Sequence, residues 1–442
     1  MKLFYALLVL LILSNCSFDK KSGIWKNDDN INLKKNKNIF KDFKEVNTTI
    51  KPYKETITLN KNFNFNIGEP FPNRNWSDIY FNKYNNLKNL QFNGLNKVSF
   101  KSKKLTRHKV DKYTLFENNN FILHDNKGNI IVYSLKLKTI ILKFNFYKKK
   151  YKNFQKQLNL IVENGVIYVS DNIGYIYAYN YNSEKLLWAK NYKKPFRSNI
   201  KLSLNNLVTS NQNNDLFILD KKKGNLKKLI PSEETAINNK FKNNIVLSDQ
   251  KIFFLNTYGS LYSVDNNTLE LNWFINLNKS LDLSLNNLFY GSNPVYYKNN
   301  IFVSSNESFY VLNSVTGSIL SKKSYSSFLR PILINNYIFL ISKNNYLLAI
   351  DIQSGEIIYS YDVAQKVSDF KNTKKQELKI KNFYLVNSKI LIFLENSKLI
   401  QFDESGEIEK IYKLPSKLNS SPIFVNESLI FLDRKNKLLV IN

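Results

Sequence analysis

The stretch that decides the fold is "LLAIDIQSGEIIY", residues 347–359. A short apolar run ends at Asp351, the next residues include Ser354 and Gly355, and a second apolar run ends at Tyr359. An Asp side chain can accept hydrogen bonds from the backbone of a turn, and Gly tolerates the positive φ that tight turns require. The stretch therefore predicts two antiparallel strands joined by a short turn.

Eight segments of the chain repeat a β run, a turn and a second β run. Their last residues are 38 to 52 residues apart, with a mean spacing of 44. In chain order these last residues are Ser134, Asn180, Asp220, Asp265, Asn313, Asp351, Asp403 and Asn442. A period of about 40–45 residues with four strands per unit is typical of β-propellers. We therefore predict an all-β, eight-bladed β-propeller with four-stranded blades.

The last repeat predicts how the ring closes. Asn442 ends the third strand of the eighth unit, so the fourth strand has to come from another part of the chain. A blade without it would leave an unpaired edge and an open seam. The alternating segment "NKVSFKSKKLT", residues 96–106, precedes the first unit. We predict that this N-terminal segment is the outermost strand of the last blade.

The N-terminus, "MKLFYALLVLLILSNCS", has the regions of a signal peptide. A basic Lys2 precedes an apolar run that is too short for a lasting membrane span. The sequence before Cys16 resembles a bacterial lipobox, although Asn15 replaces the usual small residue. The resemblance implies that residues 1–15 are removed and that Cys16 is lipidated. An ordinary secretory signal is the alternative.

Three regions follow from these patterns: a signal peptide at 1–15, a lipidated Cys16 with a flexible tether at 16–66, and a propeller at 67–442. The tether is expected because residues 17–66 are polar and low in complexity. Cys16 is the only cysteine, so the exported chain forms no internal disulfide. Ser17 follows it where an Asp would imply retention in the inner membrane, which favours the outer membrane.

The formal net charge is +30, from 65 Lys and Arg against 35 Asp and Glu. Such a charge can attract an acidic partner. Nucleic acid is not expected, because the chain carries an export signal and no nucleic-acid-binding motif. The lysines accompany many Asn and Ile residues, as codons of an A/T-rich genome would produce. A solvated surface and an attraction to acidic proteins or lipid headgroups both remain open.

The lipobox, the eight quinoprotein-like repeats and the segment "NRNWSDIYFNKYNN" with Trp76 together resemble the BamB family. These are propeller lipoproteins of the outer-membrane β-barrel assembly (BAM) machinery. The resemblance implies a noncatalytic periplasmic scaffold without a cofactor, anchored by its lipid to the outer membrane. It implies binding to BamA and other BAM members, and assistance to outer-membrane protein clients during folding and insertion.

The resemblance also implies a partner-binding loop that carries an Arg beside apolar residues. The matching segment is "KKPFRSNIKLS", which contains Phe196 and Arg197, and Arg330 occupies the equivalent place in "FLRPIL". Arg suits such a contact because its planar fork binds carboxylates and carbonyls in a bidentate manner. The alternative is that these arginines bond neighbouring blades at the central channel.

A quinoprotein dehydrogenase that uses pyrroloquinoline quinone (PQQ) is the main enzymatic alternative. Such enzymes resemble this chain in their blades, but they also need a metal site of carboxylates and amides, an Asp base and a stacking Trp. His108 and His124 lack the spacing of a metal site. No phosphate-binding glycine loop or serine-hydrolase elbow occurs. We therefore predict no catalytic residue, metal or cofactor.

Residues that recur once per blade are expected to be structural. Turn capping explains the recurrence of an acidic residue, whereas a metal site would need convergence. An aromatic at the end of a repeat is expected to pack between blades. The predicted blade residues are Trp188, Trp273, Asp220, Asp265, Asp351, Gly355, Tyr359 and Asp403. A third functional class is a basic propeller that binds cell-envelope polyanions such as peptidoglycan or lipopolysaccharide.

Overall fold

The structure, a computed structural model, describes residues 16–18, 25–27, 53–95, 97–233, 242–278 and 289–442. The chain divides into two units, residues 1–49 and residues 50–442. In the first unit, strand β1 (Cys16–Phe18) pairs antiparallel with strand β2 (Trp25–Asn27). The expected signal peptide and most of the expected tether lie outside the described residues.

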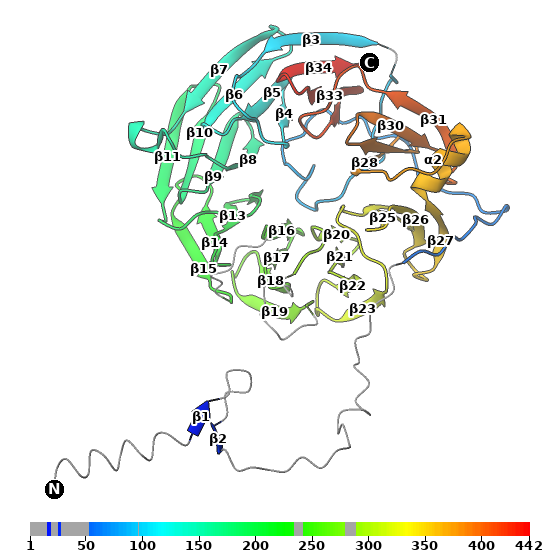
Figure 1. Ribbon diagram of the computed structural model, residues 1–442. Coiled ribbons are helices and arrows are strands. Elements are labelled where there is room, and N and C mark those ends of the chain that lie inside the picture. Colours follow the sequence, from blue (N-terminus) through cyan, green and yellow to red (C-terminus); the bar gives the residue numbers. More distant parts are fainter. Residues whose placement is uncertain (1–15, 19–24, 28–52, 96, 234–241, 279–288) are drawn as a thin grey trace. The chain divides into compact units, whose positions relative to one another are not determined.

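The second unit consists of eight four-stranded antiparallel sheets in a ring (Figure 1). We number the sheets as blades 1 to 8 and give their strands from the axis outward. Blade 1 has β4 (Leu115–Glu117), β5 (Asn120–His124), β6 (Asn129–Ser134) and β7 (Thr139–Asn145). Blade 2 has β8 (Leu158–Glu163), β9 (Val166–Asp171), β10 (Tyr175–Asn180) and β11 (Lys185–Asn191). Blade 3 has β12 (Lys201–Leu202), β13 (Asn206–Ser210), β14 (Leu216–Asp220) and β15 (Leu226–Ile230).

The next three blades continue the same order. Blade 4 has β16 (Asn244–Leu247), β17 (Lys251–Leu255), β18 (Ser260–Asp265) and β19 (Leu271–Asn276). Blade 5 has β20 (Val295–Tyr297), β21 (Asn300–Ser304), β22 (Phe309–Asn313) and β23 (Ile319–Lys323). Blade 6 has β24 (Ile332–Ile334), β25 (Tyr337–Ile341), β26 (Tyr346–Asp351) and β27 (Ile357–Asp362).

The last two blades complete the ring. Blade 7 has β28 (Ile380–Val386), β29 (Lys389–Leu394), β30 (Lys398–Phe402) and β31 (Ile408–Lys413). Blade 8 has β32 (Ile423–Val425), β33 (Ser428–Leu432), β34 (Lys437–Ile441) and the N-terminal strand β3 (Val98–Lys104). The predicted eight-bladed all-β propeller is therefore confirmed.

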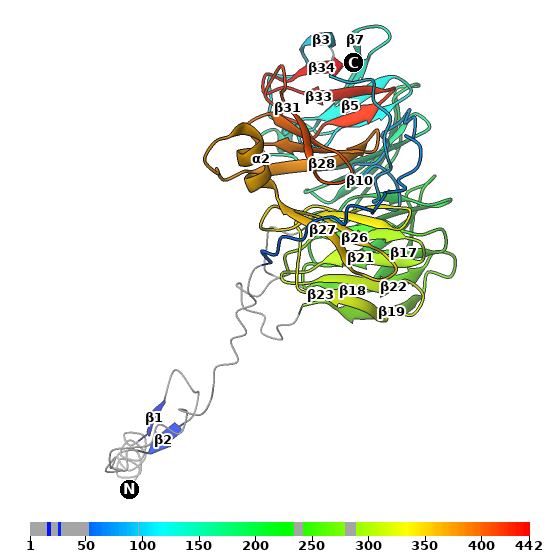
Figure 2. The same ribbon diagram turned by 90° about the vertical axis from the view of Figure 1, so that its right-hand side faces the viewer.

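The predicted closure of the ring by an N-terminal strand is also confirmed. Strand β3 pairs antiparallel with β34, which places Val98 opposite Ile441 and Lys101 opposite Leu439. The backbones of Lys97 and Asn442 exchange two hydrogen bonds of 3.0 and 3.1 Å. Figure 2 shows β3 beside β34, next to the C-terminus. Both ends of the propeller sequence thus share one sheet, which leaves no open seam.

Two helices interrupt the strands in the described part of the chain. A single 3₁₀ turn, η1 (Lys149–Tyr151), follows blade 1, and the helix α2 (Val363–Lys371) follows blade 6. The side chain of Asp362 caps α2 by accepting from two backbone amides, and Asn372 ends it in the left-handed region. Neither helix is long and apolar enough to cross a membrane.

The buried core lies between neighbouring blades. Five apolar clusters fill the successive interfaces from blade 1 to blade 6. The largest cluster joins blades 6, 7, 8 and 1 to residues between Ile67 and Val110. The middle strands are therefore apolar on both faces, as expected for sheets that pack on two sides. The outermost strands are mostly exposed, because one of their faces meets water, and β11 buries only Trp188.

The turn between the third and fourth strand of a blade is capped by the residue that ends the repeat. In blade 6 the Oδ1 of Asp351 accepts from the backbone amides of Gln353 and Ser354, at 2.9 and 2.8 Å. Asp220 and Asp265 make the corresponding pairs of bonds, and Asp403 accepts from Glu407. These bonds to backbone amides lower the pKa of both Asp220 and Asp265.

Aromatic residues of one blade contact the glycine of this turn in the next blade. Trp273 of β19 packs on Gly317, and its Nε1 donates to the carbonyl of Ser314 at 3.3 Å. Trp188 of β11 packs on Gly224 in the same way. Tyr359 is completely buried and lies against Gly406. The glycine is needed because a side chain there would collide with the aromatic ring.

Residues 53–66, the last part of the expected tether, pack along blade 6. The backbones of Ile57 and Ser360 exchange hydrogen bonds of 3.0 and 2.9 Å across the outer edge of β27. The ring of Phe65 lies 5.0 Å from that of Tyr337 and 5.9 Å from that of Tyr359. The sequence-based boundary at residue 67 thus excludes residues that the structure packs on the propeller.

Two glycine substitutions test the contact between blades. Gly317 and Gly355 both have positive φ, +76° and +66°, so alanine at either position costs about 1–2 kcal/mol of backbone strain. A Cβ at Gly317 would also lie 2.6 Å from the Trp273 ring, whereas at Gly355 it meets only the end of the Lys323 side chain at 3.4 Å. We expect Gly317→Ala to cost about 1–3 kcal/mol more than Gly355→Ala because of this overpacking.

The midpoints of thermal unfolding for the two variants and the wild type measure this difference. Equal losses in the two variants would show that the aromatic contact contributes nothing beyond the turn itself.

Candidate functional site

The central channel is filled by residues 71–93, which we call the inner segment. It runs along the ring and bonds to the innermost part of every blade (Figure 1). In order from blade 1 to blade 8, the residues of the inner segment that make these bonds are Trp76, Ser77, Asp78, Lys83, Tyr84, Asn86, Leu90 and Asn73. Asn93 then returns to blade 8 through its bond to Glu427.

Trp76, which marked the family resemblance, anchors the start of the inner segment. Its backbone exchanges hydrogen bonds of 2.7 and 2.9 Å with Phe116 of β4. Its ring is 3% exposed and packs edge-on against Phe81 at 4.9 Å and Tyr384 at 6.4 Å. Trp76 was expected from the family resemblance, whereas no pattern in the sequence predicts that its segment fills the channel.

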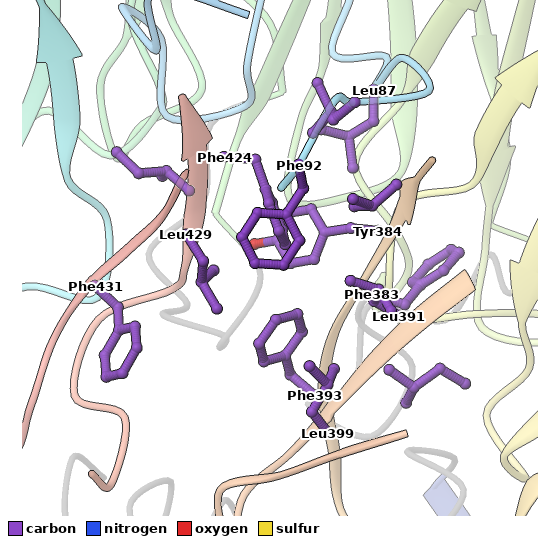
Figure 3. Packing of buried hydrophobic residues seen from close by; sticks show 14 of the residues in the cluster. Leu87, Phe92, Phe383, Tyr384, Leu391, Phe393, Leu399, Phe424, Leu429 and Phe431 are labelled. Carbon is purple, nitrogen blue, oxygen red and sulfur yellow. The ribbon is translucent and has the colours of Figure 1, made fainter. Parts of the chain in front are cut away.

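Aromatic residues close the axis near blades 7 and 8. Figure 3 shows Phe92, Tyr384 and Phe424 lying together, with Leu87 nearby. The rings of Phe92 and Phe424 are 5.4 Å apart, and those of Tyr384 and Phe424 are 5.3 Å apart. The Tyr384 hydroxyl donates to the carbonyl of Pro422 at 2.7 Å. The axis at this level is therefore a packed core.

A buried ion pair joins the inner segment to blade 3. The Nζ of Lys201 donates to the Asp78 carboxylate at 2.6 Å and to the carbonyl of Asn82 at 2.8 Å. Lys201 is completely buried and Asp78 almost so. Burial lowers the pKa of Lys201 to about 8, against the opposing effect of the Asp78 charge. This pair is costly to break, because either partner alone would leave an uncompensated buried charge.

Arg330, expected at a partner surface or at the channel, lies at the channel. Its guanidinium donates to the backbone carbonyls of Tyr80 at 2.9 Å and Asn85 at 2.6 Å. The guanidinium carbon also lies 4.8 Å above the Tyr80 ring. Burial lowers the pKa of Arg330 and raises that of the Tyr80 phenol. The two hydrogen bonds from Arg330 hold Tyr80 and Asn85 of the inner segment in place. The donors that make these bonds are therefore not free to contact a partner.

Phe196 and Arg197 precede the innermost strand of blade 3. Phe196 is 3% exposed and packs edge-on against Tyr192 and Phe217 in the core between blades 2 and 3. The backbone amide of Arg197 bonds to the carbonyl of Ser210 at 2.9 Å, and its side chain is half-buried. A partner contact through Phe196 would require its removal from this core.

The face on which the chain passes from one blade to the next is called here the connection face. On this face the channel opens into a pocket of about 320 Å³. Its floor and walls include Tyr80, Tyr113 and Tyr384, and its cationic residues are Lys112, Lys242, Arg330 and Lys381. The opposite face has a pocket of about 540 Å³, lined in part by Phe71, Tyr84, Tyr296 and Tyr297.

The described residues do not fit the metal site of a quinoprotein dehydrogenase. No group of three or more His, Cys, Asp or Glu side chains in this part of the chain could hold a metal ion. The recurring aspartates of the blades cap turns that lie away from the axis. Trp188 and Trp273 lie on outermost strands, so neither can stack on a cofactor in the channel.

The family whose sequence model matches the chain is described as "Outer membrane protein assembly factor BamB", and the match covers residues 148–361. The matched residues span blades 2 to 6. No curated protein matches the chain by sequence.

Solved structures share the fold at low sequence identity. BamB from Moraxella catarrhalis has a TM-score of 0.61 at 12% identity, over 78% of this chain and 98% of its own. A quinohemoprotein alcohol dehydrogenase from Comamonas testosteroni has a TM-score of 0.59 at 9% identity, over 80% and 76%. A europium-containing methanol dehydrogenase has a TM-score of 0.57 at 10% identity, over 83% and 89%. At these identities the likeness shows the fold alone.

The fold and the repeats define the chain as an eight-bladed propeller of the PQQ-like repeat class. Within this class, the sequence match confirms the predicted resemblance to the BamB family over residues 148–361, and the fold shared with BamB from Moraxella catarrhalis agrees with it.

The buried pair Asp78–Lys201 can be tested by a double-mutant cycle. We expect Asp78→Asn and Lys201→Met each to lower the free energy of unfolding by about 3–5 kcal/mol, because each leaves one buried charge or polar group without its partner. The double variant should cost clearly less than the sum of the two. Chemical denaturation of the four proteins measures the cycle, and strictly additive losses would contradict a direct pairing.

The pH dependence of the same variants provides a second measurement. The pKa of Lys201 in the folded protein, about 8, lies below that of a lysine in the unfolded chain. Between these two values the unfolded state binds more protons, so the stability contributed by Lys201 rises with pH. The wild type should therefore gain stability relative to Lys201→Met between pH 8 and about pH 10.

Proposed function

We propose that the protein is a noncatalytic scaffold of the BAM complex that binds BamA and assists the folding and insertion of outer-membrane proteins. The observation that carries this proposal is the match of residues 148–361 to the BamB family model. The fold that the chain shares with BamB from Moraxella catarrhalis supports it. The misfit of the described residues to a quinoprotein metal site supports the noncatalytic part.

The packing of the channel suits a scaffold. The inner segment ties all eight blades together, so the ring presents the loops of each face at fixed positions. Loops on a rigid frame are the usual place for binding residues. Exposed apolar side chains also lie on several outermost strands, among them Leu187 on β11 and Phe274 on β19. These edges could receive extended segments of a partner chain.

The proposed location is the periplasmic face of the outer membrane, with lipid on Cys16 as the anchor. The signal-peptide pattern expected at 1–15 and the lipobox pattern around Cys16 support this location. In the described residues, packing against the propeller begins at Tyr53, whose ring contacts Tyr325 and Tyr346. Residues between Cys16 and Tyr53 would then connect the lipid to the propeller.

The proposed contact with BamA lies on the connection face, near Arg197. Of the three residues suggested by the family resemblance, Phe196 is buried in a core and Arg330 holds the inner segment. Arg197 is half-buried and precedes the innermost strand of blade 3 on that face. We therefore assign the partner-binding role to Arg197 and the loop around it.

Affinity capture from membranes of the source organism tests the scaffold proposal. The full-length tagged protein should recover BamA after solubilisation in mild detergent. We expect Arg197→Gln to lower the recovery, while Lys190→Gln on the outermost strand β11 removes the same charge and should leave it unchanged. Absence of BamA with a correctly folded bait would refute the proposal.

A quinoprotein dehydrogenase is the second candidate, because two solved dehydrogenases share the fold. We expect no dye-linked alcohol oxidation after incubation with PQQ and calcium, since the described residues offer no cluster of metal ligands. A steady-state assay over a series of alcohols measures this. Robust turnover that depends on added PQQ would overturn the noncatalytic assignment.

A further inference from the structure

The pocket on the connection face gathers positive charge without any carboxylate in its lining. Its charged residues are Lys112, Lys242, Arg330 and Lys381. Lys112 and Lys242 are exposed and Lys381 is half-buried, so the mutual repulsion of the group is the main cost that a nearby anion would relieve. Whether the pocket favours an anionic ligand therefore depends on which charged groups lie near these lysines.

The three lysines occupy one equivalent position in three blades. Lys112, Lys242 and Lys381 each lie five residues before the last residue of an innermost strand, in blades 1, 4 and 7 respectively. Because the blades form a ring, these positions surround the axis at the mouth of the channel. The three lysines are therefore distant in the sequence, and the ring of blades brings them to one opening.

None of the three lysines makes an ion pair with a described residue. Burial lowers the pKa of Lys242 and of Lys381, and the charge of Lys112 lowers both further. Asp111 acts in the opposite direction on Lys242, and Glu395 does so on Lys381. Two carboxylates, Asp111 and Glu395, therefore act on a larger group of cations.

Arg330 supplies the floor of the pocket. Its guanidinium is held by the carbonyls of Tyr80 and Asn85, so its position is fixed and its charge is only partly compensated. The lysine ammonium groups above it are compact charges with three donors each, which suits them to phosphate-like oxyanions. Tyr80 and Tyr384, which line the pocket, are buried.

A second lobe of the pocket contains an unsatisfied polar group. It has a volume of about 260 Å³, shares Tyr80, Tyr113 and Lys242 with the first lobe, and includes the carboxylate of Asp111 in its lining. His124 lines it, is 5% exposed, and has a buried Nδ1 atom without a hydrogen-bond partner among the described residues. Buried polar atoms are rarely left unpaired, so we expect a water molecule or a polar ligand in the lobe to bond to this atom.

We propose that the mouth of the channel on the connection face is a binding site for a small polyvalent oxyanion, held by Lys112, Lys242 and Lys381 above Arg330. The volume of the first lobe lies at the small end of ligand pockets, which favours a compact anion over a polymer segment. This site uses the channel mouth and needs no partner protein. It adjoins the loop of Arg197, since Ser198 forms a bridge with Asn243 and, besides burial, the Arg197 charge lowers the pKa of Lys242.

Isothermal titration calorimetry with inorganic tripolyphosphate tests the site on the full-length protein. The wild type should bind one equivalent, with an affinity that falls as salt is added. Each substitution Lys→Gln at positions 112, 242 and 381 should weaken binding about 10-fold, as expected for loss of one charge-assisted contact. Citrate in place of tripolyphosphate shows whether carboxylates serve as well as phosphates.

A matched triple variant separates the site from the general charge of the protein. Lys143→Gln, Lys190→Gln and Lys228→Gln remove three exposed charges from the outermost strands of blades 1, 2 and 3. This variant should bind within about 2-fold of the wild type, and Lys→Arg at the three site positions should retain binding because the charge is kept. The proposal would be overturned if the surface triple variant lost as much affinity as the Lys→Gln variants of the site, or if the wild type showed no saturable binding.

Discussion

Hydrogen bonds between residues 71–93 and the innermost strands hold this propeller together. An innermost strand has a partner on one side only, so its other edge faces the axis with unpaired backbone groups. The inner segment bonds to the backbone of that edge in seven blades, as in Trp76–Phe116 and Leu90–Leu385, and meets blade 3 through the side chain of Lys201. At the outer rim, the ring is stabilised by the contacts between aromatic residues and turn glycines of neighbouring blades. The pairing of β3 with β34 closes it.

Filling the channel decides which side chains are left for function. Arg330 and Lys201 are cations that the inner segment binds through carbonyls and through Asp78. Lys112, Lys242 and Lys381, near the start of three innermost strands, line the channel mouth and make no ion pair with a described residue. One segment thus separates cations that stabilise the fold from cations that remain open to a ligand. The loop around Arg197 adjoins the channel mouth, because Ser198 forms a bridge with Asn243, next to Lys242. The proposed BamA contact and the proposed anion site are therefore neighbours on one face.

Much of the architecture was predictable from local sequence. The period of 44 residues and the Asp or Asn that ends seven of the eight repeats are short-range features, and they gave the blade number. Tyr359 occupies the position in its repeat that Trp188 and Trp273 occupy in theirs, and its packing against the next blade followed from this. The course of the inner segment was not predictable, since its partners lie up to 351 residues away, as in the bond from Asn73 to Phe424. Its irregular backbone also lacks the periodicity that identifies a strand or helix.

The sequence by itself determined the fold class, the number of blades and the closing strand, because turn chemistry and apolar period act over a few residues. It also carried the family resemblance. Only the tertiary structure decided that Arg330 belongs to the core of the channel, that Phe196 is buried, and that Lys112, Lys242 and Lys381 surround one opening. The physical reason is that a ring brings equivalent positions of distant repeats to one axis, where burial and like charge change their chemistry.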